Sequence, residues 1–131
     1  MANPLKIVIA GCSGRMGHAL LEAVFADADL VLHGALDRAG NPQLGRDAGE
    51  QFGIVSAVRL SDDVDAALKN ADVLVDFTRP EASMAYLASC QKHGVKMIIG
   101  TTGFSAEQKL AIELAAKQTA IVFAPNMSVG V

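Results

Sequence analysis

The chain has 131 residues with a formal net charge of −3, and 51% of them are hydrophobic. This length and apolar content predict one domain with a sizeable core, and the lack of a basic stripe argues against nucleic-acid binding. The apolar runs fall short of the ~18 residues of a membrane helix. The N-terminal run is also too short for a signal peptide, so we expect a cytoplasmic protein without membrane contact.

The two cysteines, Cys12 and Cys90, are far apart in the sequence, which predicts reduced thiols rather than a disulfide or a metal site. The sequence has five Phe, one Tyr and no Trp, so the core must consist mainly of aliphatic side chains. Such a core is typical of a buried parallel sheet covered by helices.

Short aliphatic runs predict strands at residues 7–10, 30–32, 73–75, 97–99 and 120–123, with a sixth candidate at 54–58. Amphipathic segments between them predict helices that begin near Gly14, Asp62, Pro80 and Ser105. The segment 38–53 is rich in glycine and is expected to form a mobile surface loop.

Helical spacing predicts which residues of three helices face the core: Met16, Ala19, Leu20, Ala23 and Val24; Val64, Ala67 and Leu68; and Leu110, Ala111, Leu114 and Ala115. Ser61 is expected to cap the second helix, and a Ser-x-x-Gln capping box at Ser105 the fourth. Pro80 favours the first turn of the third helix, although Thr78 and Glu81 also have capping-box spacing, which leaves its start open by about one residue.

The alternation of strands and helices predicts an α/β fold with a mainly parallel, doubly wound sheet. We expect one domain over residues 1–131. The sequence stops directly after a strand, at residues 126–131, so we expect a second domain to be missing from this chain.

A glycine-rich loop follows the first predicted strand. Gly11 permits a tight turn, Gly14 lets the backbone approach a phosphate, and Gly17 lets the next helix pack closely on the strand. The helix N-terminus favours the pyrophosphate of a dinucleotide. The G-x-x-G-x-x-G spacing differs from the usual G-x-G-x-x-G, and an ordinary β–α turn is the alternative. Its place between a strand and a helix predicts a Rossmann-type domain that binds NADH or NADPH through Gly11, Cys12, Ser13, Gly14, Arg15 and Met16.

An acidic residue lies at the expected distance from this loop. Asp37 is 20 residues after Gly17 and can accept hydrogen bonds from both ribose hydroxyls of the adenosine. Arg38 follows it and could bind the 2′-phosphate of NADPH, or be an ordinary solvated residue. The pair predicts a site that accepts either nicotinamide cofactor.

Polar and glycine-rich segments follow three later strands, at 77–80, 100–103 and 124–127. Ligands of doubly wound sheets bind beyond the carboxyl ends of the strands. Ordinary turns are the alternative for each segment alone. Together they predict further contacts with the cofactor.

The candidate acid–base residues are few. We expect His18, His33 and His93 to be structural, because none lies at the predicted rim beside another titratable group. Asp76 ends a buried strand and is expected to organise the following loop rather than to catalyse. The sequence therefore predicts no catalytic residue in this chain.

Four segments together resemble the 4-hydroxy-tetrahydrodipicolinate reductase family, the dihydrodipicolinate reductases of bacterial lysine and diaminopimelate synthesis. They are residues 10–17, 76–81, 99–104 and 124–131, and the resemblance extends over essentially the whole chain. It implies hydride transfer from NADH or NADPH to a cyclic imine dicarboxylate.

The resemblance also implies the position of each site residue. It places Gly11 to Met16 on the pyrophosphate, Asp37 on the ribose and Arg38 by the 2′-phosphate. The residues that would line the nicotinamide side are Phe77, Gly100, Thr101, Thr102, Ala124, Pro125, Asn126 and Met127. Thr102 would be closest to the substrate.

Family members carry a His-His pair and a Lys in a second domain, which also makes most of them homotetramers, and this sequence has no His-His pair. We therefore expect the chain to bind nucleotide but not to turn over substrate. The alternatives are another two-domain enzyme, such as a homoserine or semialdehyde dehydrogenase, and a non-catalytic NAD(H)-sensing regulatory domain. Neither dehydrogenase would be expected to combine Thr-Arg-Pro-Glu with Gly-Thr-Thr-Gly.

Overall fold

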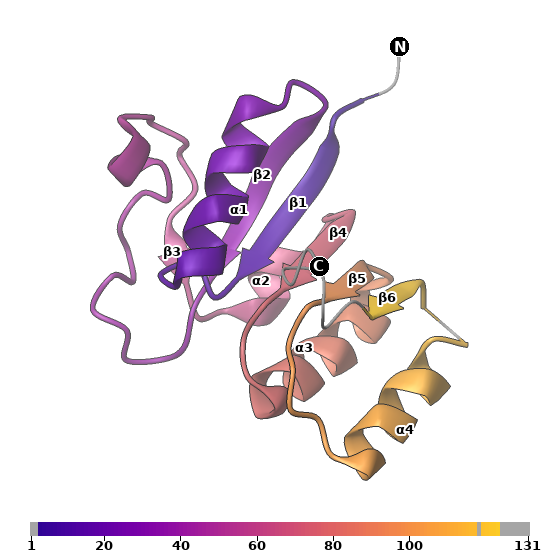
Figure 1. Ribbon diagram of the computed structural model, residues 1–131. Coiled ribbons are helices and arrows are strands. Elements are labelled where there is room, and N and C mark those ends of the chain that lie inside the picture. Colours follow the sequence, from indigo (N-terminus) through magenta and orange to yellow (C-terminus); the bar gives the residue numbers. More distant parts are fainter. Residues whose placement is uncertain (1–2, 118, 124–131) are drawn as a thin grey trace, which may run out of the picture.

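A computed structural model describes residues 3–117 and 119–123. Its six described strands form one sheet in the order β3-β2-β1-β4-β5-β6, and every neighbouring pair is parallel (Figure 1). The strands are β1 (Leu5–Ala10), β2 (Leu30–Leu36), β3 (Leu60–Ser61), β4 (Val73–Asp76), β5 (Lys96–Ile99) and β6 (Ile121–Phe123). This is the strand order of the Rossmann fold, so the predicted fold class is confirmed.

Helices cover both faces of the sheet, and the pleat of β1 separates the two cores. Ile7 and Ile9 pack with α1 (Arg15–Ala26) and the segment 44–60, whereas Val8 and Ala10 pack with the other helices. These are α2 (Val64–Leu68), α3 (Pro80–His93) and α4 (Ala106–Ala115). None of the described helices is long and apolar enough to cross a membrane.

The predicted strand at 54–58 is wrong. These residues form a loop, and the third strand is the two-residue β3. Ala57 has a φ of 63°, which is incompatible with an extended strand. The Asp47 carboxylate holds the loop instead, because it accepts hydrogen bonds from the N–H groups of Gly49, Ser56 and Ala57. The preceding segment contains a short 3-10 helix, η1 (Glu50–Phe52).

Two predicted helix faces are also wrong in part. On α1 the buried residues are Gly17, Leu21 and Val24, while Ala19 and Ala23 are exposed. The close approach of Gly17 to the glycine loop sets this rotation, which spacing alone does not reveal. On α4 the buried residues are Ile112 and Ala115, while Leu110 and Leu114 are each more than half exposed.

The predicted helix ends are mostly confirmed. Pro80 is the first residue of α3, and Ser105 forms the capping box of α4 with the Gln108 backbone and side chain. The cap of α2 is Asp63 rather than Ser61, because the Asp63 side chain accepts from the Ala66 N–H and the Ser61 hydroxyl accepts from the Asp63 N–H. The inward face of α2 is as predicted: Leu68 is buried, with Val64 and Ala67 half-buried.

Candidate functional site

A cleft of about 320 Å³ opens at the carboxyl ends of the central strands. It lies where the connections of β1 and β4 diverge to opposite sides of the sheet, the usual ligand site of this topology. Its lining consists of Gly11, Ser13, Gly14, Asp37, Arg38, Phe77, Thr78, Arg79, Ala82 and Tyr86. The structure thus brings together residues from the glycine loop, the end of β2 and the start of α3.

The glycine loop is compact because two of its glycines meet. Gly11 has a φ of 84°, a region that side chains rarely adopt. A Cβ on Gly17 would lie 2.1 Å from the Gly11 carbonyl oxygen and 2.7 Å from the Cys12 Cα. The predicted close packing at Gly17 is therefore confirmed. At Gly14 a Cβ would meet only the Gly11 oxygen, at an ordinary 3.5 Å, so the folded protein itself does not require glycine there.

The first turn of α1 is open to an anion. Its N-cap is Gly14, which has no side chain to cap the helix, and the first turn holds no acidic residue. In contrast, side chains cap α2 and α4, and each has an acid in its first turn. The N–H groups at the start of α1 are therefore left for a ligand, and the helix dipole favours a negative one.

Asp37 lies beside this turn and is already hydrogen-bonded. Its Oδ2 accepts from the Ser13 N–H at 2.8 Å and from the Ser13 hydroxyl, and its Oδ1 accepts from the Arg38 N–H at 2.8 Å. Partial burial opposes ionisation, but these bonds outweigh it and lower the pKa of Asp37. Asp37 is therefore a carboxylate at neutral pH.

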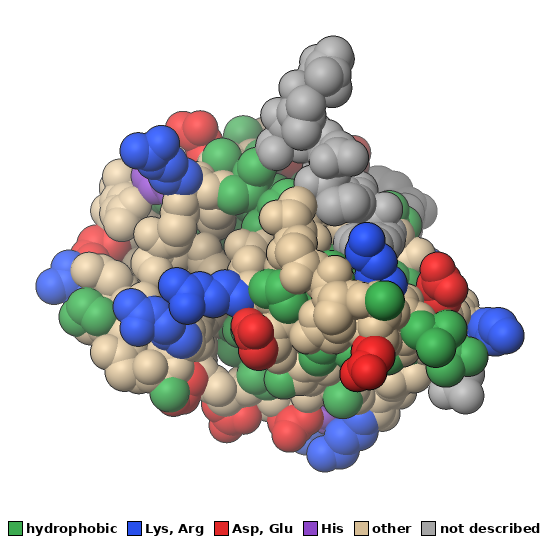
Figure 2. Space-filling view, turned by 60° about the horizontal axis from the view of Figure 1, so that its bottom comes forward, with side chains coloured by type: hydrophobic (Ala, Val, Ile, Leu, Met, Phe, Trp, Pro, Cys, Tyr) green, Lys and Arg blue, Asp and Glu red, His purple; other side chains and the backbone are tan. Residues whose placement is uncertain are grey.

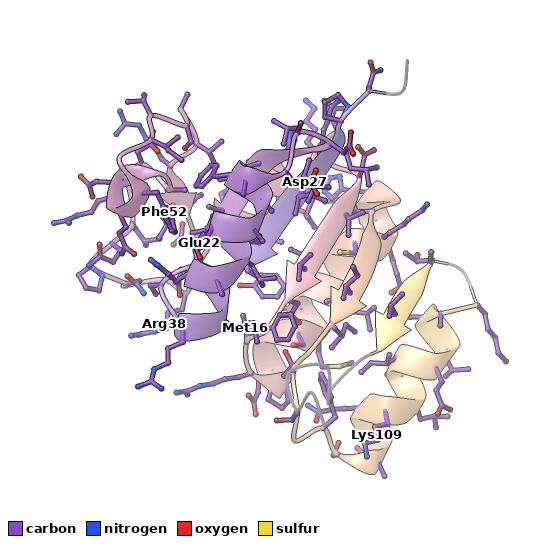
Figure 3. The ribbon with its side chains drawn as sticks, turned by 45° about the horizontal axis from the view of Figure 1, so that its top comes forward. Met16, Glu22, Asp27, Arg38, Phe52 and Lys109 are labelled. Atoms are coloured by element: carbon purple, nitrogen blue, oxygen red, sulfur yellow. The ribbon has the colours of Figure 1, made fainter. Side chains whose placement is uncertain are left out.

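Two arginines border the cleft. Figure 3 shows the Arg38 side chain extending outward beside the first turn of α1. Arg79, the N-cap of α3, also lines the cleft, as does Tyr86 from the next turns of that helix. Arg79 lies in the segment 77–80 that we predicted to contact the cofactor, whereas no motif of the sequence pointed to Tyr86. Acidic and basic side chains are interspersed over the face seen in Figure 2, without a continuous basic band.

Phe77 and Gly100 are in contact, although they follow different strands. A Cβ on Gly100 would lie 2.0 Å from the Phe77 ring, so the ring rests on the Gly100 backbone. The Gly100 N–H donates to the Asp76 carbonyl oxygen at 2.8 Å. The two strand ends predicted to lie together therefore do so. Beyond them, Thr101 is buried and Thr102 is exposed.

A buried polar cluster supports these strand ends. Asp76 is fully buried, and its Oδ1 accepts from both the N–H and the hydroxyl of Thr78. Thr101 Oγ1 accepts from the Thr78 N–H at 3.0 Å and from the Ser83 hydroxyl at 2.8 Å. Burial raises the pKa of Asp76, although neighbouring hydroxyl groups oppose the shift. Asp76 thus holds the loop that follows it, as predicted, and Thr101 joins this loop to the one after β5.

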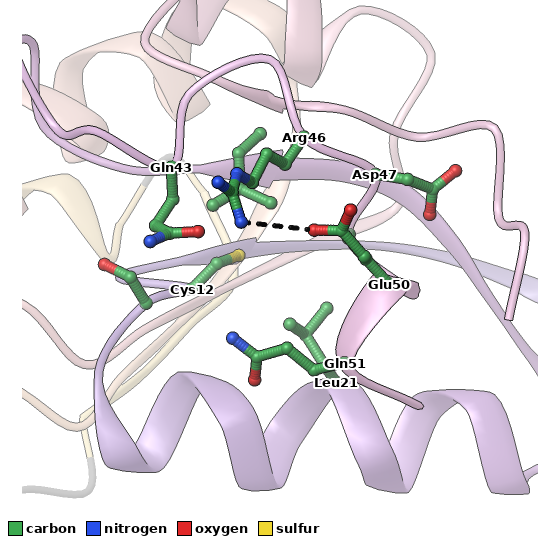
Figure 4. Close-up of a pocket in the computed structure, with 10 residues that line it drawn as sticks. Cys12, Leu21, Gln43, Arg46, Asp47, Glu50 and Gln51 are labelled. Atoms are coloured by element: carbon green, nitrogen blue, oxygen red, sulfur yellow. Dashed lines mark ion pairs between the residues drawn. The ribbon is translucent and has the colours of Figure 1, made fainter. Parts of the chain in front are cut away.

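Cys12 faces away from the cleft. Its side chain points into a small cavity of about 30 Å³ between the glycine loop, α1 and residues 43–51 (Figure 4). The thiol donates to the Ile9 carbonyl oxygen at 3.1 Å, and burial raises its pKa to about 12. Cys12 can therefore contact a ligand in the cleft only through its backbone, and its buried thiol is protonated at neutral pH. Cys90 is also a buried free thiol.

The three histidines have structural partners away from the cleft. His18 Nδ1 is 2.7 Å from Gln51 Oε1, and its ring stacks on Phe52 with centroids 4.6 Å apart. His33 Nε2 is 2.7 Å from the Lys69 carbonyl oxygen, and His93 pairs with a carboxylate on α2. The prediction that they are structural is consistent with these contacts. Within the described part of the chain, no group of His, Cys, Asp or Glu could hold a metal ion.

The remaining predicted cofactor residues fall into two groups. Arg15 is exposed and Met16 half-buried at the start of α1. Ala124, Pro125, Asn126 and Met127 lie outside the described residues.

Comparison with known proteins identifies the family. The model of the dihydrodipicolinate reductase N-terminus matches residues 5–127. The chain is 60% identical over 129 residues to the 4-hydroxy-tetrahydrodipicolinate reductase of Laribacter hongkongensis, and 58% identical over 127 residues to that of Burkholderia multivorans. These alignments cover 98% and 97% of this chain but 48% of each relative. The chain therefore spans about half the length of the curated relatives it matches.

Solved structures show the same fold. A dipicolinate-bound dihydrodipicolinate reductase from Paenisporosarcina sp. TG-14 superposes with a TM-score of 0.77 at 24% identity, covering 97% of this chain and 49% of that one. A homoserine dehydrogenase from S. aureus gives 0.70 at 18% identity, covering 92% and 32%. The homoserine dehydrogenase considered from the sequence thus shares the fold, whereas the family match separates it from this chain. The chain belongs to the dihydrodipicolinate reductase family and matches the N-terminal part of its members.

Proposed function

We propose that this chain is the dinucleotide-binding half of a reductase that uses NADH or NADPH to reduce 4-hydroxy-tetrahydrodipicolinate, a cyclic imine dicarboxylate. The observation that carries the proposal is that the uncapped first turn of α1 and the Asp37 carboxylate open onto one cleft. The name shared by the relatives supports the substrate. The domain would comprise residues 1–131, with the substrate domain in the rest of the whole protein.

The residues of the cleft fit such a cofactor. The backbone of the glycine loop, Gly11 to Met16, would bind the pyrophosphate at the start of α1. Asp37 would accept from the adenosine ribose, and Arg38 would pair with a 2′-phosphate when one is present. Both side chains line the cleft next to Gly14, where a Cβ would obstruct the phosphates.

The second half of the cofactor would lie along the ends of β4 and β5. Phe77, which rests on Gly100, would flank the nicotinamide. The buried Thr101 would fix the backbone of the loop after β5, and the exposed Thr102 would face the substrate. Ala124 to Met127 would complete this side. When bound, the cofactor would supply a hydride that takes the place of the 4-hydroxyl group of the substrate. That hydroxyl group would leave as water after it takes up a proton from a donor outside the residues described here.

Separate titrations with NADH and NADPH test this proposal. We expect both cofactors to bind the wild-type chain saturably. The fluorescence of the reduced nicotinamide measures this binding. Arg38→Ala should weaken the binding of NADPH by about tenfold, the equivalent of one charge-assisted hydrogen bond. The affinity for NADH should change little.

Arg46→Ala is a matched control, because this arginine forms a surface pair with Glu50 at 3.6 Å (Figure 4) and should affect neither affinity. If neither cofactor bound to the wild-type chain, the proposed function would be wrong. Equal weakening of both by Arg38→Ala would refute the 2′-phosphate role alone.

A further inference from the structure

A directional chain of hydrogen bonds ends on the Asp37 carboxylate. Asn41 Nδ2 donates to Ser13 Oγ at 2.9 Å, and the Ser13 hydroxyl donates to Asp37 Oδ2. Asn41 is only 8% exposed, whereas Ser13 is exposed at the cleft. The chain thus runs from a buried amide to a carboxylate that faces the proposed adenosine site.

The direction of this chain is fixed by a third residue. Asn41 Oδ1 accepts from the Gln43 N–H at 2.8 Å, so its NH₂ group must be the part that faces Ser13. Because Ser13 Oγ accepts from that NH₂ group, its own proton is left to point at Asp37. The serine is therefore held as a donor to the carboxylate.

The acceptor capacity of Asp37 is largely used in this state. A carboxylate has about four lone-pair directions. Three are taken, by the Ser13 N–H, the Ser13 hydroxyl and the Arg38 N–H. A ribose that donates from both of its hydroxyls needs two, so one existing donor must leave. The two N–H groups belong to the backbone, which leaves the exposed Ser13 hydroxyl as the donor that can rotate away.

We propose that Ser13, oriented by Asn41, sets the selectivity between NADH and NADPH by competing with the ribose for Asp37. This inference rests on the proposed function, because it concerns the same cofactor. The 2′-hydroxyl of NADH must displace the serine proton. The 2′-phosphate of NADPH cannot donate to Asp37, so the serine stays in place and reduces the repulsion between the carboxylate and the phosphate.

The two cofactors should therefore respond in opposite directions to Ser13→Ala. The variant keeps the backbone N–H bond to Asp37 and removes the competing hydroxyl, which is also the acceptor of the Asn41 amide. NADH should bind more tightly and NADPH more weakly, which shifts the ratio of their Kd values by about tenfold, the equivalent of one net hydrogen bond. Asn41→Asp keeps the acceptor for the Gln43 N–H but removes the donor, and should shift the ratio in the same direction.

The matched control is Ser105→Ala on α4, which alters a helix cap outside the cleft and should leave the ratio unchanged. Circular dichroism would establish that each variant is folded. If Ser13→Ala changed both affinities by the same factor, or changed neither affinity, the selectivity role of Ser13 would be wrong. The proposed function would not be affected by that result. Absence of binding to the wild-type chain would overturn both.

Discussion

Gly17→Ala is expected to lower the free energy of unfolding by about 3 kcal/mol and to abolish cofactor binding. The new Cβ would lie 2.1 Å from the Gly11 carbonyl oxygen, 2.7 Å from the Cys12 Cα and 2.8 Å from the Gly11 carbonyl carbon. All three are backbone atoms, so relief requires α1 to move off β1. Overpacking of this kind costs about 1–3 kcal/mol, and here it also deforms the loop that would hold the pyrophosphate. Urea denaturation measures the first effect, and NADH titration measures the second.

Gly14→Ala tests whether this glycine is required for cofactor binding and not for the stability of the fold. Gly14 has ordinary backbone angles, a φ of −83° and a ψ of 173°, and an added Cβ would make a normal contact of 3.5 Å. We therefore expect its stability to stay within about 0.5 kcal/mol of the wild type, as for other surface substitutions. NADH binding should nevertheless be lost, because the methyl group would occupy space that the phosphates need. Full binding by Gly14→Ala would refute the proposed position of the pyrophosphate.

Asp76→Ala is expected to destabilise the protein by about 1–3 kcal/mol, because the half-buried Thr78 loses the acceptor of its hydroxyl group. Asp76→Asn should be much milder, since the amide oxygen can still accept from Thr78. The amide also removes the ionisation of a fully buried carboxyl group. Comparison of the two variants by urea denaturation separates the loss of hydrogen bonds from the loss of charge.

The pH dependence of stability provides a second measurement at Asp76. Burial raises the pKa of Asp76 in the folded chain above its ordinary value of 3.8, so the unfolded chain releases this proton first as the pH rises. The contribution of Asp76 to stability is therefore present at acid pH and decreases as the pH rises from about 4 through the pKa of the folded state. Relative to the wild type, Asp76→Asn should gain stability over that range. The exposed Asp62→Asn is the control, and a parallel pH profile for wild type and Asp76→Asn would contradict the buried-charge account.

Most of the fold could be predicted from the sequence because its signals are local. The aliphatic runs that became β1, β2, β4 and β5 are continuous, as expected for the inner strands of a parallel sheet, and the run of the edge strand β6 follows the same pattern. Pro80 and the Ser105 capping box each determine a helix start through bonds within one turn. The third strand could not be predicted in this way, because a carboxylate ten residues away, Asp47, holds Ala57 in its left-handed conformation.

The candidate site also combines residues that local sequence signals predict with residues that only long-range packing brings together. The sequence by itself predicted the glycine loop, Asp37 and Arg38, since each follows a strand at the spacing of a dinucleotide-binding motif, and all of them border the cleft. Only the tertiary structure decided that Cys12 turns inward, that Tyr86 reaches the cleft, and that Asn41 orients Ser13 toward Asp37. Asn41 and Ser13 are 28 positions apart along the chain, and Tyr86 is still farther from the glycine loop with which it shares the cleft. These relations arise because the parallel strands end at one edge of the sheet, where loops distant in sequence pack side by side.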